Sequence, residues 1–180
     1  MLRRTAAIAL LALFAMVVAA PSWAARPGGS PHAPACTIVG TDGDDSLRGT
    51  SGDDVICAMG GDDYVNGRSG NDTILLGKGV DGFTGGRGDD VIRAGAGPDS
   101  GFGGSGNDTI SMQGGNDNIV SDGQGVDAIY GGPGDDSCLS AFDGQGGDTI
   151  DGGDGYDIYG ADPGDSVTGA EEGPYHCEGG

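Results

Sequence analysis

The chain has 180 residues, of which 41 are glycine, and 28 acidic side chains against 8 basic ones give it a formal net charge of −20. This composition, read without regard to order, is typical of disorder and excludes the hydrophobic core of a conventional enzyme domain of this length. The negative charge disfavours nucleic acid and anionic membrane surfaces as partners, because like charges repel.

Residues 1–24 are predicted to be a secretory signal peptide. A positive start at Arg3 and Arg4 precedes an uncharged apolar stretch over 6–20. Ser22-Trp23-Ala24 then provides a small-x-small cleavage site. The alternative, a transmembrane helix, needs about 20 apolar residues, which is more than this stretch contains. The sequence therefore predicts a secreted, extracellular protein, with the periplasm as the alternative location.

A short linker follows the signal peptide and leads into a repetitive domain. Residues 25–35 are rich in proline, glycine and alanine, and they are predicted to form a mobile linker. Over the remaining residues, 36–180, aspartates recur every nine residues from Asp45 to Asp117, and the series continues with spacings of 10, 9, 12 and 9 as far as Asp157. A glycine precedes each of these aspartates by two residues, a register that a solubilising linker would not need.

Individual repeats match a known nonapeptide. The segments GGRGDDVIR at 85–93 and GGSGNDTIS at 103–111 fit the pattern GGxGxDxUx, in which U is apolar. The chain therefore resembles the RTX, or haemolysin-type, calcium-binding repeat family over about residues 38–167. The resemblance implies an all-β fold, a right-handed parallel β-roll (a two-sheet β-solenoid) of about 13 nonapeptide repeats. In this family the first six residues of a repeat form a calcium-binding turn, and the last three form a strand.

Alternation of the repeats between two sheets predicts two inward ladders at position eight of the repeat. The first ladder comprises Ile56, Ile74, Ile92, Ile110, Ile129, Ile150 and Val167. The second comprises Leu47, Val65, Phe83, Gly101, Ile119, Cys138 and Tyr159. Gly101 leaves a gap in the second ladder for Phe83 or Phe102 to fill. A core with one inward side chain in nine residues is too thin to hold the fold alone.

The aspartates at position six are the predicted calcium ligands. Calcium takes six to eight oxygen ligands, and glycine lets a turn direct its carbonyl oxygens at one point. The predicted ligands are Asp45, Asp54, Asp63, Asp72, Asp81, Asp90, Asp99, Asp108, Asp117, Asp127, Asp136, Asp148 and Asp157. Turns two repeats apart would hold about eleven Ca²⁺ ions between them. Without that charge compensation the chain is expected to be unfolded, so calcium binding and folding should be coupled.

Four cysteines, Cys36, Cys57, Cys138 and Cys177, lie towards the two ends of the repeats. An even number of cysteines in an exported chain favours disulfides, and four cysteines allow three connectivities. Pairing each cysteine with its neighbour in the sequence would staple both ends of the roll. Free thiols are the alternative, because Cys138 falls on an inward position. The lack of a CxxC motif disfavours zinc.

The chain contains no catalytic motif. Its two histidines, His32 and His176, lie in the linker and the tail, and no GxSxG or HExxH segment occurs. We therefore expect no enzyme activity. The predicted function is that of an exported calcium-binding repeat protein with a structural, adhesive or calcium-buffering role. The alternative is an accessory module that binds carbohydrate or cell wall for a hydrolytic enzyme, so the expected partners are calcium ions and a glycan or cell-surface component.

Overall fold

The computed structural model describes residues 35–170, apart from the side chains of residues 119–122. The predicted signal peptide (1–24), the predicted linker as far as residue 34, and residues 171–180 lie outside the described part. Every element between residues 35 and 170 is a β-strand. That part of the chain thus has no helix with the length and hydropathy needed to cross a bilayer.

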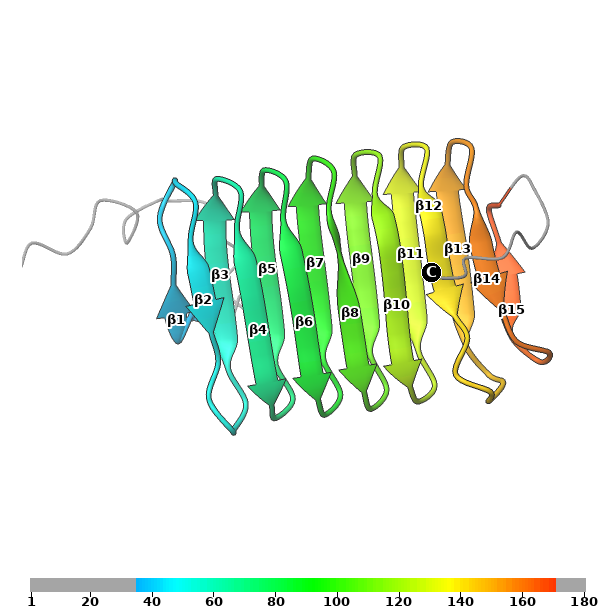
Figure 1. Ribbon diagram of the computed structural model, residues 1–180, viewed down its shortest axis with the longest axis horizontal. Coiled ribbons are helices and arrows are strands. Elements are labelled where there is room, and N and C mark those ends of the chain that lie inside the picture. The colour runs from blue at the N-terminus through cyan, green and yellow to red at the C-terminus, as the bar shows by residue number, and fades with distance from the viewer. Residues whose placement is uncertain (1–34, 171–180) are drawn as a thin grey trace, which may run out of the picture. The chain divides into compact units, whose positions relative to one another are not determined.

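The described residues form two parallel sheets (Figure 1). One contains β1 (Ile38–Val39), β3 (Val55–Gly60), β5 (Thr73–Lys78), β7 (Val91–Ala96), β9 (Thr109–Gly114), β11 (Ala128–Pro133), β13 (Thr149–Asp154) and β15 (Ser166–Thr168). The other contains β2 (Ser46–Arg48), β4 (Tyr64–Ser69), β6 (Gly82–Arg87), β8 (Ser100–Ser105), β10 (Asn118–Gln124), β12 (Ser137–Ala141) and β14 (Tyr159–Ala161). We call these the odd and the even sheet. Consecutive strands alternate between them, which confirms the two-sheet parallel β-solenoid.

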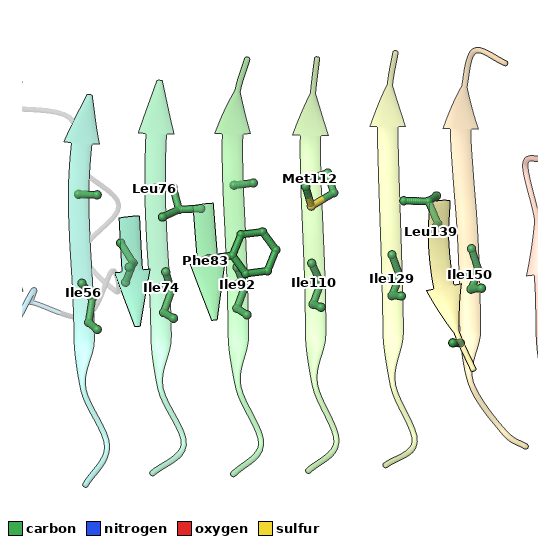
Figure 2. Packing of buried hydrophobic residues seen from close by; sticks show 14 residues of the cluster. Ile56, Ile74, Leu76, Phe83, Ile92, Ile110, Met112, Ile129, Leu139 and Ile150 are labelled. Atoms are coloured by element: carbon green, nitrogen blue, oxygen red, sulfur yellow. The ribbon is translucent and has the colours of Figure 1, made fainter. Parts of the chain in front are cut away.

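The pairing register stacks equivalent positions of repeats that lie two apart. Ile56 pairs with Ile74 and Ile74 with Ile92, each 18 residues further along the chain. The isoleucines of the odd sheet are completely buried and lie side by side in one row across neighbouring strands (Figure 2); they are Ile56, Ile74, Ile92, Ile110, Ile129 and Ile150. The predicted isoleucine ladder is therefore confirmed, and Val167 packs against it at the last strand.

The prediction of three-residue strands with one inward side chain per repeat is wrong. Most strands have six residues, because each runs on into the first three positions of the next repeat. In β5, for example, both Ile74 and Leu76 are buried, as the two-residue alternation of a strand requires. Position one thus gives the odd sheet a second inward ladder, formed by Ala58, Leu76, Ala94 and Met112. From β3 to β9 each strand of this sheet therefore contributes two inward side chains, where the repeat pattern predicts one.

The placement of Cys138 in the inward ladder is also wrong. Leu139 is fully buried and pairs with Val120 and Tyr159, whereas Cys138 has a positive φ of 57° and is only half-buried. The register also places Val120 opposite Gly101, although Ile119 is the residue that the repeat count predicts. One extra residue in each of β10 and β12 therefore forms a bulge that shifts the pairing register by one, and in β12 it makes Leu139 the inward residue.

Phe83 fills the gap beside Gly101. A Cβ atom on Gly101 would lie 2.5 Å from Phe83 Cγ, and Phe83 is 2% exposed. Phe102, the other predicted occupant, is instead half-exposed on the outer face. Figure 2 shows the Phe83 ring among the aliphatic side chains of the core. Glycine is thus needed at position 101 to accommodate a large neighbour.

Replacing Gly101 with alanine is expected to destabilise the folded protein by about 1–3 kcal/mol, because the added methyl group overpacks the core against Phe83. Urea unfolding followed by circular dichroism measures the change. Gly52→Ala is the matched control, since a Cβ atom on Gly52 would meet nothing within 4 Å. Equal midpoints for the two variants would contradict this packing role.

Candidate metal centres

The turns arrange the position-six aspartates in two columns, one along each edge of the roll. Asp54, Asp72, Asp90, Asp108, Asp127 and Asp148 precede strands of the odd sheet. Asp45, Asp63, Asp81, Asp99, Asp117, Asp136 and Asp157 precede strands of the even sheet. Twelve of these side chains are at most 7% exposed, and Asp45 is half-buried. The structure therefore gathers all thirteen predicted ligands, but as ladders and not as a single cluster.

One oxygen of each buried carboxylate ties neighbouring turns together. The backbone N–H of Asp72 donates to Asp90 Oδ1 over 2.8 Å, and the N–H of Asp90 donates in turn to Asp108 Oδ1 over 2.8 Å. The same bond recurs along both columns, so the Oδ1 atoms from Asp63 to Asp157 accept eleven such bonds. Oδ1 is therefore a structural acceptor, and Oδ2 is left for another partner.

The second carboxylate oxygen has no hydrogen-bond donor in ten turns. These buried atoms are Oδ2 of Asp63, Asp72, Asp81, Asp90, Asp99, Asp108, Asp117, Asp136, Asp148 and Asp157. Burying an ionised oxygen without a donor or a cation is strongly unfavourable. Ten repetitions of that cost in one small domain point to a positively charged ligand at the turns.

In turns that have glycine at position one, a main-chain carbonyl oxygen faces the same space as the orphaned atom. A Cβ atom on Gly85 would lie 2.5 Å from Asp90 Oδ2 and 2.5 Å from the carbonyl oxygen of Gly103. Gly67 has the same two neighbours one coil earlier, Asp72 Oδ2 and the Gly85 carbonyl oxygen, also at 2.5 Å. Only glycine leaves this space open. A carboxylate and a carbonyl oxygen that converge without a donor repel each other unless a cation joins them.

The first two turns satisfy their aspartates with protein donors. Thr50 donates to Asp54 Oδ2 from its backbone N–H (2.6 Å) and from its hydroxyl (2.9 Å). Thr41 does the same for Asp45 Oδ2, at 2.6 and 2.9 Å. Thr37 adds a hydroxyl bond to Asp54 Oδ1. At Asp45 and Asp54 these protein donors occupy the oxygen that is orphaned in the later turns.

The pKa values of the central aspartates shift in the opposite direction from that of Asp54. Burial is the main cause that raises the pKa of Asp90 and Asp117 to about 6 and that of Asp99 and Asp108 to about 7. A backbone hydrogen bond opposes this rise, and neighbouring carboxylates add to it. The Thr50 N–H lowers the pKa of Asp54, against a smaller opposing effect of burial. The central turns therefore resist holding a bare negative charge, whereas the Asp54 turn stabilises it.

The oxygen atoms that converge at the turns suit a hard cation. No three His, Cys, Asp or Glu side chains gather at one point within residues 35–170, so a site would combine a carboxylate oxygen with main-chain carbonyl oxygens. Such all-oxygen sets suit calcium, while zinc prefers nitrogen and sulfur. The residues that would hold an ion are the position-six aspartates and, in the turns where position one is glycine, the carbonyl oxygens of those glycines, such as Asp90 with Gly103. Bound calcium would neutralise the buried carboxylates.

One predicted disulfide lies at the N-terminal end of the described part. Cys36 and Cys57 are disulfide-bonded, with their Cα atoms 5.9 Å apart, which links the first residues of the roll to β3. Cys138 is also disulfide-bonded. Cys177, its predicted partner, lies outside the described residues.

The fold and the turns define a repeat protein that is built to bind cations along two edges. The family model of the RTX calcium-binding nonapeptide repeat matches residues 39–74, 75–110 and 112–143. These segments cover more than half of the chain, and the chain belongs to this family. No curated protein matches the chain.

Proposed function

We propose that this protein is an exported calcium-binding module that folds when calcium ions enter its two columns of turns. The observation that carries the proposal is the set of ten buried Oδ2 atoms without a donor. Calcium would supply the missing charge at each of them, so the free energy of ion binding becomes free energy of folding. We propose a binding or structural role for the module and no catalysis of its own.

Not all thirteen aspartates would bind calcium equally. The ten aspartates with an orphaned Oδ2 are the proposed ligands. Asp127, which lies in the same column as Asp90 and is 4% exposed, remains a predicted ligand. Asp45 and Asp54 are proposed to close the roll without an ion, because threonine donors already occupy their Oδ2 atoms. The N-terminal end would thus be a metal-independent cap.

Export is supported by chemistry at the same end of the roll. A disulfide such as Cys36–Cys57 persists in oxidising compartments outside the cytoplasm. The N-terminal pattern of the sequence, with its positive start and small-x-small site, fits the same route. Calcium would then reach the chain after translocation and complete the fold outside the cell.

Calorimetric titration of the chelated protein with calcium, recorded alongside far-ultraviolet circular dichroism, tests the proposal. We expect several ions to bind per chain and the β signal to rise with their binding. Titration with magnesium is the control, because magnesium requires a tighter octahedral site and keeps its waters. A full β signal before any calcium is added would overturn the coupling, and a chain that binds no calcium would overturn the function.

A further inference from the structure

The outer face of the even sheet carries a hollow between two aromatic side chains. It has a volume of about 340 Å³ and is lined by residues of β4, β6, β8 and β10, which are neighbours in the sheet (Figure 1). Tyr64 on β4 and Phe102 on β8 line it and are 50% and 52% exposed. The calcium turns occupy the edges of the roll, so neither aromatic residue has a role in ion binding.

The hollow exists because Gly82 has no side chain. The register places Gly82 between Tyr64 and Ser100 on the outer face. A Cβ atom on Gly82 would lie 3.1 Å from Tyr64 Cδ2, so the tyrosine ring leans over the glycine. Thr84 and Phe102 are paired on the adjacent outward row. A flat ligand can therefore contact both aromatic rings, because no side chain at Gly82 blocks the space between them.

Uncharged polar groups line the same hollow. Thr84, Ser100 and Asn118 contribute two hydroxyls and an amide. Within residues 35–170, the hydroxyls of Tyr64, Thr84 and Ser100 make no hydrogen bond to another protein group. They can thus donate to and accept from a ligand. An aromatic pair with a few polar groups that are free to bond is the usual lining of a small-molecule site.

The charge of the lining residues and the spacing of the two aromatic rings limit the class of ligand that the hollow can bind. None of the residues that line the hollow is charged, so a ligand would be held there by aromatic faces, hydroxyls and an amide, and the net charge of −20 disfavours an anionic ligand. Tyr64 and Phe102 lie two strands apart, about 10 Å across the sheet at the usual strand spacing. Two units of an extended β-linked glycan span a similar distance.

We propose that this hollow binds a neutral, extended, β-linked polysaccharide. Sugar rings would stack on Tyr64 and Phe102, and their hydroxyls would bond to Thr84 and Ser100. This inference rests on the proposed function, because β4, β6 and β8 lie between calcium turns. The hollow would give the module a second kind of ligand, a polysaccharide, in addition to calcium.

The experiment is calorimetric titration of the calcium-loaded full chain with cellohexaose and with chitohexaose. We expect one of these neutral oligosaccharides to bind, and binding to weaken about tenfold in Tyr64→Ala and in Phe102→Ala. Tyr130→Ala is the matched control, since Tyr130 is an aromatic residue of similar exposure (41%) on the odd sheet. Circular dichroism of each variant, in calcium and in chelator, reports the fold independently.

The outcomes separate the two proposals. A folded, calcium-dependent protein that binds neither oligosaccharide would overturn the glycan site and leave the calcium function standing. Binding that is equally strong in Tyr64→Ala and Phe102→Ala would also overturn it. Concentration-dependent self-association that Phe102→Ala abolishes would assign the face to a second copy of the chain instead. A chain without β structure in calcium would overturn the proposed function and the hollow together.

Discussion

Adding a chelator to the calcium-loaded protein at pH 7 is expected to replace its β spectrum with that of a coil. Ten buried carboxylate oxygens would then lack any positive partner, and the chain carries a net charge of −20. The core, with at most two inward side chains per repeat, cannot offset both effects. Far-ultraviolet circular dichroism measures the change, and excess calcium should reverse it. A chelated protein with the spectrum of the loaded one would contradict the expectation.

Acid should partly replace calcium in the same experiment. The pKa of Asp99 and Asp108 in the metal-free fold is about 7, well above the ordinary value near 3.9 of an unfolded chain. Between these values the folded state binds more protons, so its stability increases as the pH falls from 7 towards 4. Below pH 4 both states are protonated and the gain is complete. We therefore expect the chelated protein to gain β signal between pH 7 and 5. A chelated protein equally unfolded at both pH values would contradict the burial of these carboxylates.

Replacing Asp90 with asparagine is expected to raise the calcium concentration at the folding midpoint about tenfold, because the ligand loses its charge while the shape is kept. The carbonyl oxygen of the new amide can still accept the Asp72 N–H, so the hydrogen-bond ladder survives. Neighbouring coils should lose β structure at low calcium, since each coil contacts only its neighbours. Calorimetry should also find fewer bound ions.

Asp54→Asn is the matched control for that substitution. Asp54 lies in the same column as Asp90 but takes its Oδ2 donors from Thr50. We expect a stability loss of about 1 kcal/mol from weaker hydrogen bonds and an unchanged number of calcium ions. If both variants lost the same number of ions, the metal-independent cap would be wrong. If neither changed the stoichiometry or the midpoint, Asp90 would not be a ligand.

The resemblance to the repeat family implied the two sheets, and the nine-residue register then placed the isoleucine ladder, because position eight of every second repeat falls on the same sheet. A nine-residue register could not predict the second inward ladder, because position one differs between the repeats of the two sheets. Position one holds glycine at 67 and 85, where Oδ2 and carbonyl atoms need the space, but Leu76 and Met112 point inward at the same position on the other sheet. The signal is an 18-residue period in which apolar residues recur at 58, 76, 94 and 112.

The errors at the end of the roll have a local cause. The spacing of 10 between Asp117 and Asp127 shows that a residue is inserted, but the repeat count cannot say whether the turn or the strand accepts it. The structure accommodates it within β10, where Val120 pairs with Leu139. The threonine donors at Asp45 and Asp54 could not be predicted either, because a threonine at position two fits the repeat pattern as well as any other residue.

Nearly all pairing in the roll joins segments that are close in the sequence. Each strand pairs with another about 18 residues away, as Ile74 does with Ile56 and Ile92. A coil can therefore close once three consecutive repeats are free to fold, without waiting for the rest of the chain. It also follows that deleting residues 73–90, one pair of repeats, should shorten the roll by one coil and leave the register on both sides intact. The length of the roll can therefore change in units of 18 residues without a new arrangement of the core.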